Sequence, residues 1–307
     1  MSAGDRRLPG KAMLKKLLTI TPPRISYPII HKVLGWLDQF GRVPAGVTTY
    51  LGHSFVYPLD SVIGREIALG EEWDALLGTI IPALLPMDEP VMCEVGSNIG
   101  ASLLQLMKVK PHAQLLAFEP SDRFRPFLER NLERAAISHV EVSSLLVGKC
   151  QGTMWLYNTS SSASAARARY DLKPRRKQLV TMTTLDEVFR QRPRVDFIKV
   201  DTDGFDFEVL RGAEETLARD SPVLYFELFP TLLSAPAADL MWLQSTGYRH
   251  FVCFTSPGKL LGVTDNVEQT LAWAGAELYC NILVCREGSP AQRRIEGLVS
   301  HLTLLAI

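Results

Sequence analysis

From residue 90 onward, short apolar segments alternate with segments whose apolar residues recur at helical spacing. Seven apolar runs predict strands at 91–95, 114–119, 140–147, 196–201, 223–228, 248–254 and 281–285. Helical patterns separate most of them, at 100–109, 122–136, 184–190, 206–219 and 236–246. Such alternation is typical of a parallel sheet with helices on both faces. We therefore expect an α/β fold with a mostly parallel seven-stranded sheet, whose closely connected last strands leave room for an antiparallel one.

Residues 1–50 differ from the rest of the chain by their basic character. They hold eight lysines and arginines against two aspartates, and the apolar residues of 31–40 recur at helical spacing. We predict a basic helical arm over 1–50, packed on the main domain or on a second copy in a homo-oligomer, and a main domain over 51–307. A role at a membrane surface or on a polyanion is less favoured, because charge runs are usually solvated faces.

The segment 158–178 interrupts the alternation of strands and helices. It is polar, rich in serine and then basic, which is typical of a mobile loop. Because it lies between two predicted strands, it is a candidate lid over a site, although disorder without a function fits the same composition.

Composition and charge restrict the partners. The chain has 307 residues, 33 lysines plus arginines and 33 aspartates plus glutamates, so its net charge gives no general attraction for nucleic acid. No apolar run approaches the ~20 residues that cross a bilayer, and Lys15 and Lys16 interrupt the apolar start that a secretion signal would need. The five cysteines form no CxxC pair and are expected to be buried thiols. We expect a cytoplasmic protein.

Two acidic and glycine-rich motifs follow the first two predicted strands. EVGSNIG spans 94–100, where Gly96 permits a sharp turn and Gly100 a close approach of helix to strand. Glu119 ends the next strand, where a carboxylate can accept both hydroxyl hydrogens of a ribose. The dinucleotide motif GxGxxG is absent because residue 98 is asparagine. These features favour S-adenosylmethionine, which needs no phosphate cradle, and Glu94 could face its ammonium group.

A third motif, FIKVDTDGFDFEVLRGA at 197–213, brings Asp201, Asp203 and Asp206 to the same edge of the sheet. Clustered acids at a strand end must be solvated, paired or coordinated, because burying them alone is costly. The simpler alternative is that these acids only cap the helix that follows.

The order EVGSNIG, AFEP, FIKVDTDGFDFEVLRGA and VLYFEL resembles the FkbM family of S-adenosylmethionine-dependent methyltransferases. The resemblance covers roughly residues 50–287 and implies a class I methyltransferase, Rossmann-like fold. The family motifs read acid-(V/I)-G-A-N-x-G and K-(I/V)-D-V-E-G-x-E. Here Ser97 replaces the alanine, Thr202 the valine, and Asp203 and Asp206 the two glutamates, which shortens both acids.

The resemblance also implies which residues hold the cofactor. They come from four strand ends: Glu94, Gly96, Ser97, Asn98, Gly100, Glu119, Pro120, Ser144, Leu145 and Asp201. Family members methylate hydroxyl groups of sugars, polyketides and related metabolites, so the implied reaction is in-line methyl transfer to a small-molecule acceptor. The hydroxyl proton needs an acceptor. The candidate catalytic residues are Asp201, Asp203 and Glu227, with His53 and His250 as alternatives.

Metal use and two other functions stay open. Three carboxylates could bind Mg²⁺ through oxygen ligands, but no tightly bound metal is expected. A phosphatase of the haloacid dehalogenase type also has an apolar strand ending in D-x-D-G. Against it, Phe205 stands where threonine or valine is usual, and the motif lies two-thirds along the chain. The other alternative is a non-catalytic cofactor-binding or scaffold protein on the same fold.

Overall fold

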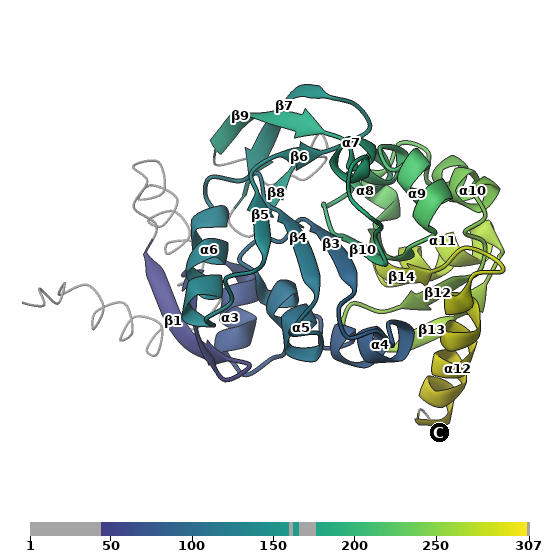
Figure 1. Ribbon diagram of the computed structural model, residues 1–307, viewed down its shortest axis with the longest axis horizontal. Coiled ribbons are helices and arrows are strands. Elements are labelled where there is room, and N and C mark those ends of the chain that lie inside the picture. The colour runs from purple at the N-terminus through teal and green to yellow at the C-terminus, as the bar shows by residue number, and fades with distance from the viewer. Residues whose placement is uncertain (1–43, 160–161, 166–175, 306–307) are drawn as a thin grey trace, which may run out of the picture.

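A computed structural model describes residues 44–159, 162–165 and 176–305 of the chain. Its centre is an eight-stranded sheet in the order β13-β12-β14-β11-β10-β3-β4-β5 (Figure 1). The strands are β3 (Val91–Val95), β4 (Gln114–Phe118), β5 (Glu141–Ser143), β10 (Phe197–Val200), β11 (Val223–Leu228), β12 (Phe251–Phe254), β13 (Leu260–Thr264) and β14 (Cys280–Val284). β5, β4, β3, β10 and β11 pair in parallel, whereas β14 is antiparallel to both β11 and β12.

The predicted α/β fold with a mostly parallel sheet is confirmed, with two differences in its strands. A hairpin after β12 adds β13, so the sheet has eight strands and not seven. The apolar run at 140–147 is divided between two sheets, because the chain turns after β5, where the Ser143 hydroxyl accepts from the Leu145 N–H at 3.3 Å. Its second half is β6 (Leu146–Val147), which pairs outside the central sheet.

Helices cover both faces of the sheet (Figure 1). They are α5 (Ala101–Val109), α6 (Arg125–Arg134), α7 (Leu185–Phe189), α8 (Asp206–Arg211), α9 (Glu214–Asp220), α10 (Pro236–Ser245), α11 (Val267–Ala276) and α12 (Pro290–Leu305). The single helix expected at 206–219 is two helices. They separate around Gly212, where a Cβ would lie 2.0 Å from the Gly148 carbonyl oxygen, so another segment passes against the backbone there. Thr184 caps α7 by accepting from the Glu187 N–H, as its spacing predicts.

Residues 44–90 add a unit beside α5 and α6. It comprises an antiparallel hairpin of β1 (Ala45–Tyr50) and β2 (His53–Pro58), followed by α3 (Val62–Ala68) and α4 (Leu77–Leu84). Buried Asn131 of α6 joins this unit to the sheet, because its side-chain amide bonds the N–H and carbonyl of Val56 and the carbonyl of Ile99. Most of the predicted basic arm lies outside the described residues, but its last six residues form β1 instead of a helix.

A second sheet has the order β6-β9-β7-β8 and packs at the edge near β5. It contains β7 (Gly152–Asn158), β8 (Ala163–Ser164) and β9 (Arg176–Thr183). The expected loop at 158–178 therefore begins at the end of one strand and ends inside another. Residues 160–161 and 166–175, which include most of its basic part, lie outside the described residues.

The core forms two apolar clusters, one on each face of the central sheet, and β10 contributes to both. Phe197 packs on one face, whereas Ile198 and Val200 pack on the other, as the period of a strand requires. Lys199 lies within this strand and is 1% exposed. Four cysteines are buried as predicted, but Cys150 is exposed.

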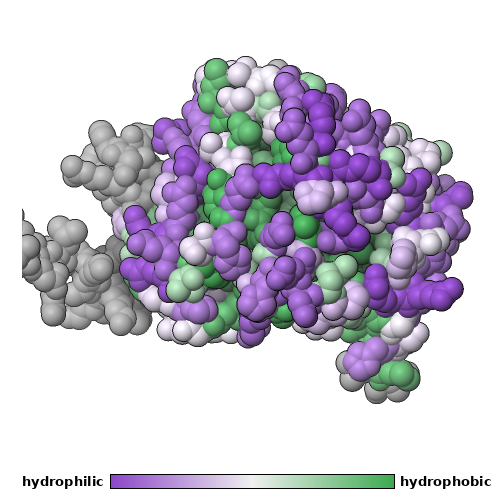
Figure 2. All heavy atoms as spheres, viewed as in Figure 1, coloured by the Kyte–Doolittle hydropathy of each residue, from purple (hydrophilic) through white to green (hydrophobic). Residues whose placement is uncertain are grey.

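Hydrophilic residues dominate the face drawn in Figure 2. In the described part of the chain, no helix combines the length and the apolar character that crossing a membrane requires.

Candidate active site

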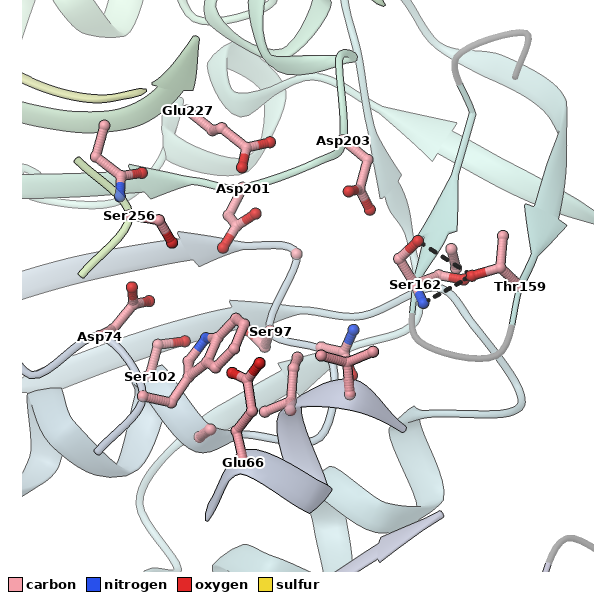
Figure 3. Close-up of a pocket in the computed structure, with 18 of the residues that line it drawn as sticks. Glu66, Asp74, Ser97, Ser102, Thr159, Ser162, Asp201, Asp203, Glu227 and Ser256 are labelled. Carbon is pink, nitrogen blue, oxygen red and sulfur yellow. Dashed lines mark hydrogen bonds between the residues drawn. The ribbon is translucent and has the colours of Figure 1, made fainter. Parts of the chain in front are cut away.

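A cavity of about 1020 Å³ lies at the carboxyl edge of the parallel strands. The loop after β3 and the ends of β4, β10 and β11 contribute one part of its lining. The other part comes from α3, from Trp73 and Asp74, and from residues next to β7, β8, β12 and β14. In open α/β sheets, ligands bind at this edge. The cavity is therefore the place where the predicted motifs can act together (Figure 3).

The loop after β3 packs directly against the end of β10, with no room for a side chain between the two backbones. Gly96 has φ +92°, and a Cβ there would lie 1.9 Å from the Asp201 carbonyl oxygen. The N–H groups of Gly96 and Ser97 both donate to the Phe118 carbonyl, which ties the loop to the end of β4. Gly100 has φ +87° and caps α5 from a position packed on Leu128. The glycines therefore bring three strand ends together without filling the space between them.

Glu119 is held rigidly at the end of β4. One carboxylate oxygen accepts from the Asn98 N–H at 2.7 Å, and the other accepts from the Ser121 N–H at 2.8 Å. The residue is 4% exposed, and burial raises its pKa to about 8 although both N–H groups favour the ionised form. A carboxylate has about four lone-pair sites. Glu119 therefore keeps one acceptor site on each oxygen for a ligand in the cavity that it lines.

A buried lysine organises the acids beneath the cavity. The ammonium of Lys199 lies 2.9 Å from Asp201 Oδ2, 3.3 Å from Asp74 Oδ2 and 3.7 Å from Glu94 Oε1. Glu94 is fully buried and also accepts from the Ser102 hydroxyl at 2.5 Å. Burial alone would lower the pKa of Lys199, but the three carboxylates raise it well above its usual value. The lysine is therefore charged, and it orients one oxygen of each neighbouring acid.

Three further acids lie near the ends of β10 and β11: Asp203 and Asp206 follow β10, and Glu227 is the next-to-last residue of β11. Asp203 and Glu227 line the cavity. Asp203 has φ +52°, and burial together with the charge of Asp201 raises its pKa to about 7. Burial and the nearby negative charges raise the pKa of Glu227 well above its usual value. Asp201, Asp203 and Glu227 lie along one side of the cavity, and Glu66 of α3 lies opposite (Figure 3).

Asp206 has a different part. Its carboxylate accepts from the N–H groups of Thr202 and Gly204 at 3.4 and 3.1 Å, and the residue does not line the cavity. Asp206 is the first residue of α8, and these two N–H groups belong to the loop before the helix, which has no side-chain cap. The simpler alternative, in which the three aspartates only cap this helix, is therefore wrong.

The part of the cavity next to Glu227 is aromatic and polar. The rings of Phe229 and Tyr279 lie 5.4 Å apart, and the Tyr279 hydroxyl donates to the Ser256 hydroxyl at 2.7 Å. Asn281 of β14 also lines this side and is the register partner of Glu227. Trp73 completes the wall next to α3.

The structure brings most of the predicted residues into one space. Those that line the cavity are Gly96, Ser97, Asn98, Glu119, Asp201, Asp203 and Glu227. Those that do not are Glu94, Gly100, Pro120, Ser144 and Leu145. Glu94 and Gly100 lie directly behind the lining, whereas Ser144 is exposed beyond the end of β5. His53 and His250 are exposed and do not line the cavity, so neither is placed to act as the base.

Sequence reasoning missed Lys199 and Asp74. Lys199 carried a signal, because a lysine inside an apolar strand must find a partner when the strand is buried. Asp74 carried none, since nothing in its local sequence shows that it meets β10. Within the described residues, no group of three or more histidines, cysteines or acids is arranged to hold a metal ion.

Comparison with known proteins gives three findings. The chain is 27% identical over 158 residues to the methyltransferase sdnD of Sordaria araneosa, an alignment that covers 41% of this chain and 61% of that protein. Among solved structures, it is 18% identical to the methyltransferase FkbM of Methylobacillus flagellatus KT, with a TM-score of 0.43 and coverage of 64% and 44% of the two chains. It is 14% identical to an S-adenosylmethionine-dependent O-methyltransferase of Thermotoga maritima, with a TM-score of 0.42 and coverage of 81% and 80%.

The chain thus spans less than two thirds of the length of sdnD and of the M. flagellatus protein. A model of a protein family also matches the chain. The model of the methyltransferase FkbM domain matches residues 94–250, about half of the chain, from the glycine loop to the start of β12. The chain therefore belongs to the FkbM methyltransferase family.

Proposed function

We propose that this protein transfers the methyl group of S-adenosylmethionine to a hydroxyl group of a small-molecule acceptor, a carbohydrate or a secondary metabolite. One observation carries the proposal. A single cavity joins Glu119 and the 96–98 loop, which suit the cofactor, to Asp203 and Glu227, which suit an acceptor. The FkbM family match supports methyl transfer. It also disfavours the phosphatase alternative for the D-x-D-G motif.

The residues present fit the cofactor. Glu119 keeps one acceptor site on each oxygen, which matches the two hydroxyls of a ribose. Gly96 leaves the floor of the cavity without a side chain. Asp201 and Asp74 place carboxyl groups in the adjacent lining, which suit the ammonium and sulfonium groups of the methionine part. Ser144 and Leu145 do not line the cavity, and their role in cofactor binding stays a prediction.

The cofactor supplies an activated methyl group on a positively charged sulfur. The protein has to orient the acceptor and take its proton. Asp203 fits the proton acceptor best, because its pKa is about 7 and a base works best when its pKa lies near the working pH. Burial and the nearby acids raise the pKa of Glu227 well above its usual value, which favours the protonated form, and a protonated carboxyl can donate a hydrogen bond to the acceptor. Asp201 is engaged by Lys199 and serves to position the cofactor side of the cavity.

Two measurements test the proposal. Calorimetry with S-adenosylhomocysteine should show binding by the wild type, and Glu119→Ala should weaken it by about 10- to 100-fold, because it removes two hydrogen bonds of roughly 0.5–1.5 kcal/mol each. Incubation with labelled S-adenosylmethionine and fractionated metabolites should then label a product on oxygen. Binding without transfer to any fraction would favour the scaffold alternative, and transfer to nitrogen or carbon would contradict the hydroxyl assignment.

A further inference from the structure

Asp74 reaches the site from a part of the chain that the family match does not include. It lies between α3 and α4, outside residues 94–250, and its backbone has φ +52°. Asparagine and aspartate tolerate this left-handed conformation better than other side chains, but it still costs free energy. The conformation places the carboxylate at the cavity wall, 3.3 Å from the ammonium of Lys199.

The charges around Lys199 do not balance. One ammonium faces three carboxylates, those of Asp74, Glu94 and Asp201. The side chain of Lys199 is 2% exposed, that of Glu94 0%, that of Asp74 12% and that of Asp201 37%, so water reaches Asp201 but screens little of the other three groups. Negative charge left uncompensated on the buried acids is costly. The free protein can lower this cost by holding protons, and burial accordingly raises the pKa of both Asp74 and Glu94.

Several other titratable groups lie near the cluster. Tyr225 and Glu227 belong to β11, Tyr50 belongs to β1 and Asp203 follows Asp201 in the chain, and none of these four carries a positive charge. Arg65 and Glu66 of α3, one basic and one acidic, line the same cavity. Lys199 is the only cation with a close contact to these carboxylates among the ion pairs of the described residues.

We infer that Asp74, Lys199, Glu94 and Asp201 form one charge centre that receives the cationic end of the cofactor, and that cofactor binding releases protons from this centre to solvent. The inference rests on the cofactor assignment made above. The ammonium and sulfonium groups of the cofactor carry two positive charges and its carboxylate carries one negative charge, so the methionine end brings net positive charge to a centre with excess negative charge. Carboxyl groups that hold protons in the free protein then ionise, and the buffer takes the protons. Asp74 is in this view a residue of the cofactor site, contributed by the unit that precedes the sheet.

Calorimetry in buffers of different ionisation enthalpy measures the number of protons released. Two probes separate the charges, because both carry the ammonium and carboxylate of the methionine part, whereas only sinefungin adds a second ammonium in place of the sulfonium. At pH 7 the wild type should release protons with both probes, and more with sinefungin. Asp74→Asn should release fewer and should weaken sinefungin binding by about tenfold, since one partly buried charge interaction is lost. Glu71→Gln, an exposed acid of the same segment, should behave as the wild type.

The outcomes separate this inference from the function on which it rests. Binding by the wild type without proton release between pH 6 and 8 would overturn the inference alone, and this measurement needs no variant. Unchanged affinity and proton count in a folded Asp74→Asn, with circular dichroism as the check on folding, would also overturn it. Failure of the wild type to bind either probe would contradict the cofactor assignment and the inference together.

Discussion

Replacing Gly96 with alanine tests whether the contact between the β3 loop and the end of β10 shapes the cavity. A Cβ at residue 96 would lie 1.9 Å from the Asp201 carbonyl oxygen, whereas real Cβ contacts are essentially never under 3.0 Å. The oxygen belongs to the main chain and cannot rotate away, so the two segments must separate by about 1 Å. Displacements of about 1 Å cost roughly 100-fold in rate in organised active sites.

The cost in stability has two parts that a matched control separates. A left-handed backbone costs a non-glycine residue roughly 1–2 kcal/mol, and overpacking costs typically about 1–3 kcal/mol more. Gly52→Ala carries only the first cost, because Gly52 has φ +85° and no atom lies within 4 Å of its Cβ position. We expect Gly96→Ala to lose about 2–5 kcal/mol of unfolding free energy in urea and Gly52→Ala about 1–2.

The two variants should also differ in their affinity for S-adenosylhomocysteine. Gly96→Ala should lose most of its affinity in calorimetry, and Gly52→Ala should retain it. Equal losses of stability in the two variants, or wild-type affinity in Gly96→Ala, would refute the argument from close approach.

Three further predictions concern the base, a buried ion pair and pH. Asp203→Asn should lower kcat by about 10²–10⁴-fold and abolish the rise of kcat around pH 7, while Glu71→Gln, at an exposed acid outside the cavity lining, keeps both the rate and the profile; a retained limb in the pH–rate profile would exclude Asp203 as the base. Arg123 donates to both carboxylate oxygens of buried Asp60 at 2.7 and 2.9 Å, so Asp60→Ala should lose about 3–5 kcal/mol in urea denaturation, and a loss below 1 kcal/mol would contradict this. Burial raises the pKa of Asp203 and Asp206 to about 7 and that of Glu119 to about 8. The folded protein thus holds more protons than the unfolded chain above about pH 4, and its unfolding free energy should fall as pH rises from 4 to 8; a rise in urea midpoint over that range would oppose this sign.

The central sheet could be predicted because its strands are buried on both faces. Such strands read as continuous apolar runs, and β3 and β11 have the bounds expected from the runs 91–95 and 223–228. The second sheet was not predicted, because β7 and β9 expose one face and therefore carry polar residues. Thr153 pairs with Thr181 and Tyr157 with Lys177 in this ladder. The serine-rich composition of 158–178, where β7 ends and β9 begins, also made the alternation of apolar and polar residues in these strands harder to recognise.

The site could be predicted to the extent that its residues follow strands in the chain. Gly96, Glu119 and Asp201 end parallel strands, and parallel strands end at one edge, so sequence order alone brings them together. The partners of Lys199 could not be predicted in the same way, because Asp74 arrives through tertiary packing of a unit whose own pattern gives no register with the sheet. Tyr279 was missed for a related reason. It precedes an antiparallel strand, so it reaches the cavity at the start of β14 and not at its end.

The direction of β14 has a consequence for how this protein can diversify. Because β14 begins where its neighbours finish, Asn281 stands opposite Glu227, and Tyr279 and Ser256 gather beside it. These three residues lie beyond residue 250, whereas the glycine loop and Glu119 lie in the first half of the chain. Under the proposed function, substitutions beyond residue 250 would change the acceptor side of the cavity and leave Gly96 and Glu119 on the cofactor side unchanged, so the range of acceptors can change without loss of cofactor binding.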